Sequence, residues 1–233
     1  MIHLVMPMAG RGSRFEGHGA KPYISLNGKP FFYWSAQSVL KFIKPVSLDF
    51  VTLKEHNAEA LIKEFYPDAR VHELPEVTAG AVVTCLEGCR NIKDDYPVVF
   101  NDCDHMFSCS EFNREEFGDA DGILLTFEAS EPKYSFVCKD ETGRITGTVE
   151  KQAVSSEAIC GCYWFKNAAV FREAAEKYLK SCSYSEFFMS GVYNVLIEEG
   201  KKVVSMKTDF HVPFGVPTEF EEAKNSEHFR ELE

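Results

Sequence analysis

The sequence predicts an α/β fold built around a largely parallel sheet. Short apolar runs alternate with amphipathic segments through the first half of the 233-residue chain, which is the pattern of βαβ units. Apolar residues make up 45% of the chain, enough for a substantial core. We expect a single domain over residues 1–233, with one half over about 1–121 and the other over about 122–233.

In the first half, each expected strand is followed by a loop and then an expected helix. The apolar residues of the first helix recur at a spacing of three to four, and Pro67 ends the second helix. The expected strands are Ile2–Met6, Leu48–Leu53, Val71–Leu74 and Tyr96–Asn101. The expected helices are Phe31–Phe42, Ala58–Phe65 and Gly80–Arg90.

The second half changes character, because strands follow one another with short turns between them. Asp140 to Gly143 has the composition of a hairpin turn, and Gly200 closes a helix. The expected strands are Gly122–Phe127, Tyr134–Cys138, Ile145–Val149, Cys160–Phe165 and Val203–Met206. The expected helices are Ala168–Tyr178, Phe187–Glu198 and Glu219–Phe229.

The amino-acid composition excludes several classes of binding partner. The chain has 25 Lys and Arg against 36 Asp and Glu, a net charge of −11, which argues against binding to nucleic acid or to a membrane surface. None of the eight cysteines forms a C-x-x-C pair, and the sequence shows no signal peptide. No run approaches the roughly 18 apolar residues that span a membrane. We therefore expect a cytoplasmic protein with free, mostly buried cysteines.

A loop with two glycines and two arginines directly follows the first expected strand. Gly10 and Gly12 let backbone N–H groups approach an anion closely, and Arg11, Arg14 and Lys21 add positive charge. In a chain that is otherwise acidic, this composition predicts a polyphosphate site.

Two well-known phosphate loops do not fit this segment. The P-loop needs Ser or Thr after a Gly-Lys pair, but Pro30 and Lys202 follow the two Gly-Lys pairs of this chain. The dinucleotide fingerprint needs a third glycine, and Phe15 stands there, where it would obstruct close packing of helix on strand.

A third pattern does match. The run from Ala9 to Arg14, then Lys21-Pro22, then Gly28-Lys29-Pro30 resembles the signature of sugar-phosphate nucleotidyltransferases, roughly A-G-x-G-[ST]-R, P-K-P and G-K-P. One departure is Ala20, where the family usually has proline. The resemblance extends from about Ile2 to Glu222. It implies a Rossmann-like, three-layer α/β/α fold with a mostly parallel mixed central sheet, as in GT-A-like nucleotidyltransferases.

The resemblance also implies an activity. A phosphorylated small acceptor, such as a sugar phosphate, would attack the α-phosphorus of a nucleoside triphosphate and release pyrophosphate. Lys21 and Arg14 would be the catalytic residues, and the C-terminal half would bind the acceptor. The residues implied to bind the nucleotide are Met8, Ala9, Gly10, Arg11, Gly12, Ser13, Thr78, Ala79 and Gly80. Thr78 is also expected to cap the following helix. The form of this segment is similar to branches that supply precursors of surface polysaccharide or capsule.

Carboxylates follow the strand that ends at Asn101. Asp104, and second Asp102, are expected to hold Mg²⁺, which prefers one or two carboxylates together with phosphate oxygens. In the acceptor half, Glu150, Lys151 and Gly161 match the family's E-K and G-x-Y-x-F segments, which bind the acceptor and its phosphate. The family's second metal-binding aspartate falls at Pro213, so that carboxylate is either missing or supplied from elsewhere.

Two other functions remain open from the sequence. Asp102-Cys103-Asp104 also fits the D-x-D motif of a GT-A glycosyltransferase, which would use a nucleotide sugar. A non-catalytic nucleotide-binding module is the other alternative. The mismatch at Pro213 favours it, whereas Lys21, Asp104 and Lys151 together argue against it. The motifs fit several acceptors and favour a pyrimidine base.

Overall fold

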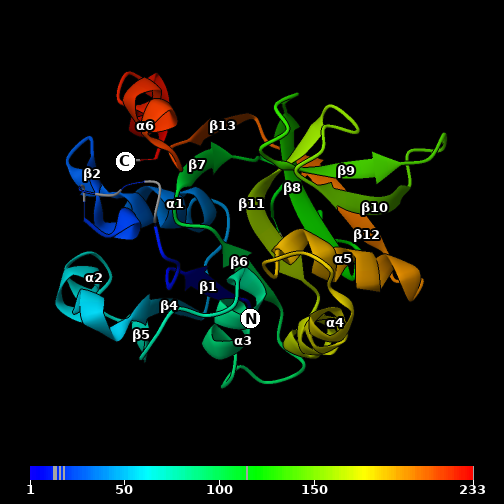
Figure 1. Ribbon diagram of the computed structural model, residues 1–233, viewed down its shortest axis with the longest axis horizontal. Helices are drawn as coiled ribbons and strands as arrows, with labels where there is room; N and C mark the ends of the chain where they lie inside the picture. Colours follow the sequence, from blue (N-terminus) through cyan, green and yellow to red (C-terminus); the bar gives the residue numbers. More distant parts are fainter. Residues whose placement is uncertain (13–14, 16, 18, 114, 233) are drawn as a thin grey trace.

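The computed structural model describes residues 1–233 except 13, 14, 16, 18, 114 and 233. Nine strands form one mixed sheet in the order β10-β9-β11-β6-β1-β4-β5, with β8 pairing with β11 and β12 (Figure 1). They are β1 (His3–Pro7), β4 (Ser47–Leu53), β5 (Arg70–Leu74), β6 (Val98–Asn101), β8 (Gly122–Glu128), β9 (Ser135–Lys139), β10 (Ile145–Glu150), β11 (Glu157–Phe165) and β12 (Val203–Lys207). All nine strands expected from the sequence are confirmed.

The strand directions differ between the two halves of the chain, as the sequence pattern predicts. β1 pairs in parallel with β4 and β6, and β4 with β5, as alternating strands and helices require. β11 pairs antiparallel with β6, β8 and β9, and β10 pairs antiparallel with β9, in the half of the chain where strands follow one another directly. Because β11 hydrogen-bonds to β6, the sheet is continuous between the two halves of the chain.

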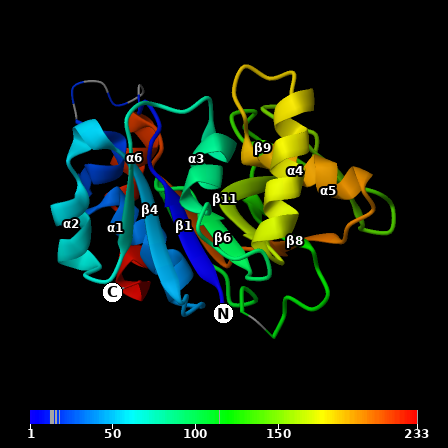
Figure 2. The ribbon, with the colours of Figure 1, turned by 90° about the horizontal axis from the view of Figure 1, so that it is seen from below.

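Helices cover both faces of the sheet (Figure 2). They are α1 (Phe31–Leu40), α2 (Glu59–Phe65), α3 (Ala81–Gly88), α4 (Ala168–Ser181), α5 (Met189–Glu198) and α6 (Pro217–Ala223). α3, α4 and α5 share one apolar core with the sheet, and α1 and α2 share the core on its other face. Burial of these two faces drives formation of the three layers, and the predicted α/β class is confirmed.

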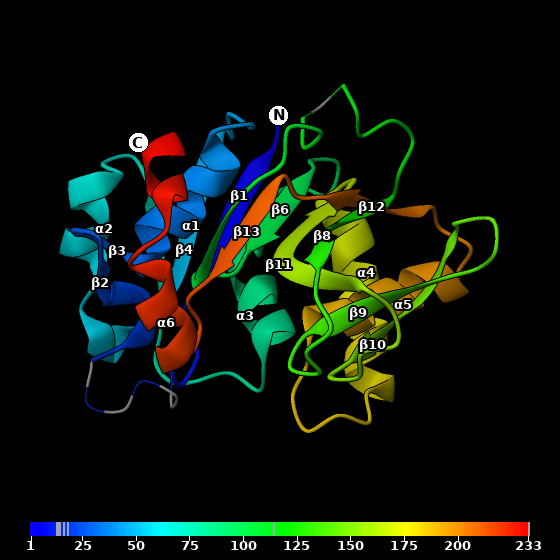
Figure 3. The same cartoon turned by 90° about the horizontal axis from the view of Figure 1, so that it is seen from above.

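A two-stranded ribbon outside the main sheet was not expected. β7 (His105–Ser108) pairs antiparallel with β13 (Phe210–Pro213), and β13 leads into α6 (Figure 3). The hydroxyls of Ser35 and Ser38 in α1 accept hydrogen bonds from the backbone N–H groups of His105 and Phe107. α1 therefore supplies hydrogen-bond partners along the edge of β7 that β13 does not cover. The ribbon brings the C-terminal segment back to the residues that follow β6.

The expected helix over Glu219–Phe229 is wrong in its bounds. α6 ends at Ala223, and a separate 3-10 helix, η4 (Glu227–Glu231), follows. Ser226 accepts a hydrogen bond from the backbone N–H of His228, so it caps a new turn and interrupts the first helix. The other short elements are 3-10 helices η2 (Lys21–Tyr23) and η3 (Lys54–His56) and the strands β2 (Ser25–Leu26) and β3 (Lys29–Pro30).

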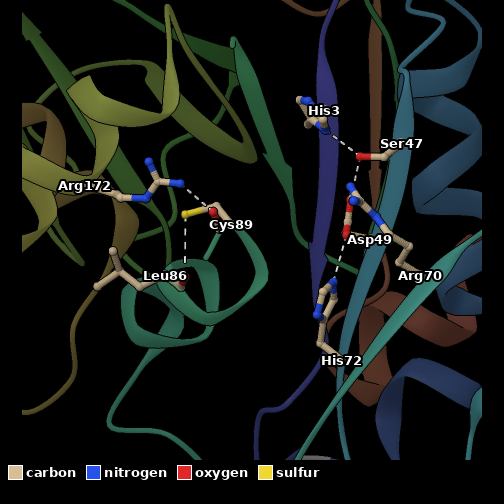
Figure 4. A network of polar contacts seen from close by, with 8 residues as sticks. All are labelled: His3, Ser47, Asp49, Arg70, His72, Leu86, Cys89 and Arg172. Atoms are coloured by element: carbon tan, nitrogen blue, oxygen red, sulfur yellow. Dashed lines mark hydrogen bonds and ion pairs between the residues drawn. The ribbon is translucent and has the colours of Figure 1, made fainter. Parts of the chain in front are cut away.

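A buried carboxylate ties three parallel strands together (Figure 4). Asp49 of β4 is 1% exposed and accepts hydrogen bonds from Arg70 (2.7 Å), His72 (2.8 Å) and Ser47 (2.7 Å). Ser47 in turn contacts Nδ1 of His3 in β1. Burial opposes ionisation of Asp49, but these hydrogen bonds outweigh it and lower its pKa.

Two further expectations concern the whole chain. All eight cysteines are free and six of them are buried, as predicted. Within the described residues, no helix is both long and apolar enough to cross a membrane.

Candidate functional site

Two adjoining cavities open at the carboxyl ends of the parallel strands, where ligands of such sheets bind. The larger has a volume of about 670 Å³ and lies beside the N-terminal loop. The smaller, of about 450 Å³, lies beside β9, β10 and β11. Asp102, Asp104, Ala81 and Phe188 line both cavities, so these residues mark the junction.

The N-terminal loop forms one wall of the larger cavity. Met8, Ala9, Gly10, Arg11 and Gly12 line this wall, and so does Lys21 at the start of η2. Gly12 has φ +60°, and a Cβ atom there would lie 3.3 Å from the Cβ of Lys21. Glycine therefore lets the loop pass close to the lysine. The predicted residues Ser13 and Arg14 lie outside the described residues.

The segment before α3 forms the opposite wall, with Thr78, Ala79 and Gly80 lining the larger cavity. Gly80 has φ +150°, and a Cβ atom there would lie 2.5 Å from the backbone nitrogen of Phe187. The N-cap of α3 is Gly80, so the expected Thr78 cap is wrong. Thr78 Oγ1 instead donates to the Gly80 carbonyl at 2.9 Å and contacts Thr84 Oγ1 at 2.7 Å.

A lysine and two carboxylates meet at the junction of the cavities. Nζ of Lys21 donates to Oδ2 of Asp104 at 2.6 Å. Burial opposes the charged form of Lys21, but the attraction of Asp104 outweighs it and raises the pKa of Lys21 above its ordinary value. Burial, and then the charge of Asp104, raise the pKa of Asp102. Lys21 is thus a fixed cation rather than a proton acceptor.

Glycines flank both carboxylates. A Cβ atom at Gly161 would lie 2.8 Å from Oδ2 of Asp102, and one at Gly215 would lie 2.5 Å from Oδ2 of Asp104. This pair of hard oxygen donors fits Mg²⁺, which takes few protein ligands and keeps water and phosphate oxygens. Within the described part of the chain, no group of three or more His, Cys, Asp or Glu residues could hold a metal ion.

Two of the three predicted acceptor residues line the smaller cavity. Glu150, at the end of β10, is 8% exposed and accepts hydrogen bonds from Ser135 and, at 3.0 Å, from Ser190. Gly161 lies in β11 with φ +101°. Both line the cavity beside Asp102.

Lys151, the third predicted acceptor residue, lies elsewhere. It has φ +54° and does not line either cavity. Its Nζ atom lies over the ring of Phe188, 4.7 Å from the centroid, in a cation–π contact. Because Phe188 lines both cavities, Lys151 contacts the wall between them rather than their interior.

Sequence reasoning missed several residues of the smaller cavity. Lys133 lines it and forms an ion pair with Glu219 at 2.8 Å. Burial opposes the charge on Lys133, but the hydrogen bond with Glu219 raises its pKa. His105 and His211 of the ribbon also line the cavity, and burial lowers the pKa of both rings, that of His105 to about 4. The pairing of β7 with β13 brings these residues together, and no local sequence pattern predicts that pairing.

Known proteins are similar to this chain in sequence and in fold. No family model matches the chain. The bifunctional protein GlmU of Acetivibrio thermocellus is 24% identical over 220 residues, 88% of this chain and 46% of that protein. The chain therefore spans about half the length of the curated relative that it matches.

Solved structures have the same fold over nearly the whole chain. The nucleoside-diphosphate-sugar pyrophosphorylase of Vibrio cholerae RC9 superposes with a TM-score of 0.84 at 21% identity, covering 96% of this chain and all of that one. A Bacillus anthracis protein assigned as a glucose-1-phosphate thymidylyltransferase gives 0.77 at 17% identity, covering 96% of this chain and 94% of that one. The predicted resemblance to sugar nucleotidyltransferases and the predicted fold of this family are thereby confirmed.

Proposed function

We propose that this chain is a Mg²⁺-dependent nucleotidyltransferase that joins a nucleoside triphosphate to a phosphorylated small acceptor and releases pyrophosphate. The observation that carries the proposal is the meeting of two cavities at Lys21, Asp102 and Asp104. A reaction between two bound substrates needs such a junction, because the reacting atoms must approach within about 3–3.5 Å.

The larger cavity is the proposed triphosphate site. Backbone N–H groups from Gly10 to Gly12 and the Arg11 side chain face phosphate oxygens, with Arg14 and Ser13 in the same loop as further ligands. Thr78, Ala79 and Gly80 hold the base against the opposite wall. Gly80 carries no side chain, so the backbone of Phe187, which also lines this cavity, can pack directly against the segment.

The smaller cavity is the proposed acceptor site, with Glu150 and Gly161 in its wall. Lys151 stacks on Phe188 and supports the boundary with the nucleotide. An oxygen of the acceptor phosphate attacks the α-phosphorus, a new P–O bond forms, and the bond to the β-phosphate oxygen breaks. Pyrophosphate leaves with that electron pair.

Positioning and charge neutralisation are the protein's part in this reaction. Lys21 is a permanent cation at the junction and faces the α-phosphate and the acceptor phosphate together. Asp102 and Asp104 would hold Mg²⁺, which when bound supplies charge neutralisation on the triphosphate. The products fit a supply of precursors for surface polysaccharide in the cytoplasm, the role that the sequence motifs favour.

The test is a pyrophosphate assay. The four common nucleoside triphosphates are combined with a panel of sugar phosphates and amino-alcohol phosphates, with Mg²⁺ and with EDTA. We expect one pairing to release pyrophosphate in a Mg²⁺-dependent reaction. Transfer from a nucleotide sugar without pyrophosphate would support the glycosyltransferase alternative. Triphosphate binding without turnover on any acceptor would support a binding module.

A further inference from the structure

The smaller cavity is strongly acidic. Four carboxylates line it, those of Asp102, Asp104, Glu150 and Glu219. These carboxylates repel a phosphate group that enters beside them, because both are negatively charged. The repulsion is stronger in a partly buried site than in water. Lys21 offsets Asp104 at the junction, but the other carboxylates remain, so a phosphorylated acceptor needs a further cation in this cavity.

Lys133 is the one lysine or arginine, among the described residues, that lines the smaller cavity. It lies in the loop between β8 and β9, and its side chain is 45% exposed. Lys21 lines the larger cavity and is engaged with Asp104. Lys151 lines neither cavity. Lys133 is thus placed where the acceptor needs a positive charge.

Glu219 holds Lys133 in the absence of substrate. Oε1 of Glu219 lies 2.8 Å from Nζ of Lys133 and accepts the Tyr134 hydroxyl at 3.2 Å. Oε2 accepts the backbone N–H groups of Gly215 (3.0 Å) and Val216 (3.2 Å). The glutamate is therefore fixed at the start of α6, whereas the half-exposed lysine is the movable partner. The Glu219 carboxylate keeps three hydrogen bonds, from Tyr134, Gly215 and Val216, when the lysine leaves, which reduces the cost of the exchange.

The Lys133–Glu219 pair lies close to the junction of the cavities. A Cβ atom at Gly215 would be 2.5 Å from Oδ2 of Asp104 and 3.6 Å from Oε2 of Glu219. Both carboxylates therefore border the same small space. A lysine released by Glu219 is within a side-chain movement of a phosphate placed beside Asp104 and Lys21.

We propose that Lys133 exchanges Glu219 for the phosphate of the acceptor and so provides the cationic part of the acceptor subsite. The proposal rests on the proposed function for the identity of the acceptor as a phosphate compound. Glu219 then has two effects. It keeps Lys133 at the cavity before binding, and it competes with the phosphate for the lysine.

Calorimetric titration with inorganic phosphate and with glucose 1-phosphate tests the proposal on the full chain. We expect Lys133→Ala to weaken binding of both probes about tenfold or more, as loss of a charge-assisted hydrogen bond does. Glu219→Gln removes the competing charge, so it is expected to tighten binding. Lys139→Ala is the matched control, because Lys139 of β9 pairs with Glu157 of β11 and lines neither cavity. It should bind both probes as the wild type does.

A structural latch would give a different result. If the pair only joins the β8–β9 loop to α6, Lys133→Ala and Glu219→Gln will weaken binding together, with a shared fall in Tm. That outcome overturns the proposal, as does a wild-type chain that binds neither probe. So does phosphate binding that Lys133→Ala leaves intact and Lys21→Ala abolishes.

Turnover separates this proposal from the proposed function. With an active substrate pair, Lys133→Ala is expected to raise the acceptor KM and leave the triphosphate KM unchanged. An equal rise in both KM values contradicts a role at the acceptor subsite. If no substrate pair releases pyrophosphate but phosphate binding still depends on Lys133, the proposed activity fails and the phosphate subsite stands.

Discussion

The substitution Gly161→Ala tests the close approach of β11 to Asp102 in the site, because it adds a single methyl group there. In Gly161→Ala, the new Cβ would lie 2.8 Å from Oδ2 of Asp102, 3.3 Å from its Cβ and 3.4 Å from its Cγ. The backbone at Gly161 also has φ +101°, a conformation that residues with a side chain rarely adopt. The substitution therefore strains the backbone and displaces a carboxylate at the junction of the cavities.

The two effects have different magnitudes. A non-glycine residue in such a conformation costs roughly 1–3 kcal/mol of unfolding free energy. The clash adds less to the loss of stability, because the Asp102 carboxylate is the free end of a side chain and can rotate away. Rotation moves one of the two proposed Mg²⁺ ligands. Pyrophosphate release should therefore fall by more than the loss of folded protein explains.

Urea unfolding and a Mg²⁺ titration of pyrophosphate release measure these effects separately. Gly147→Ala is the matched control, since Gly147 lies in β10 of the same sheet, outside the left-handed region, with its nearest neighbour Asn194 Oδ1 at 3.6 Å. We expect Gly161→Ala to lose stability relative to this control and to need more Mg²⁺. If both variants unfold at the same urea concentration and respond equally to Mg²⁺, the reasoning is refuted.

Three other predictions follow from the site and the sheet. Lys21→Ala should lower pyrophosphate release by about 1,000-fold or more, the scale of a lost electrostatic contact to a transition state, with little change in Tm; near-normal release would contradict its role. Chelation by EDTA should stop pyrophosphate release, with recovery on adding Mg²⁺ and an unchanged circular dichroism spectrum; full activity in EDTA would exclude the metal. Asp49→Asn should lower the unfolding free energy by about 1–3 kcal/mol at pH 7. Since the pKa of Asp49 is lowered on folding, its contribution is present above the ordinary aspartate pKa and is lost as the pH falls below about 4, so the difference from wild type should shrink there.

The residues that line the proposed nucleotide site lie close together in the sequence. Gly10, Gly12 and Lys21 lie within a dozen residues, and the loop that joins them follows directly from the end of β1. The fold was predictable for a similar reason, because apolar periodicity reports which face of each strand or helix is buried. These inferences need no knowledge of distant contacts.

The wall of the proposed acceptor site depends on contacts between residues far apart in the sequence, which apolar periodicity does not report. Lys133 meets Glu219 across 86 positions of sequence, and only the pairing of β7 with β13 brings α6 to that place. β7 is four residues long and follows an acidic turn, so its pattern does not distinguish it from a loop. Likewise, the motif lysine Lys151 follows β10 in a left-handed backbone conformation, and a one-dimensional match does not show where such a residue points.

The β7–β13 ribbon also bears on how the protein is made. The Asp104 carbonyl accepts the backbone N–H of Phe214 at 2.9 Å, and Gly215 borders the Asp104 carboxylate. At a synthesis rate of about 5–20 residues per second, Asp104 leaves the ribosome roughly 5–20 s before these partners. The nascent chain therefore has the proposed phosphate-binding loop long before the proposed acceptor site is complete. The chain can therefore catalyse the proposed reaction only after β13, its last strand, has been synthesised.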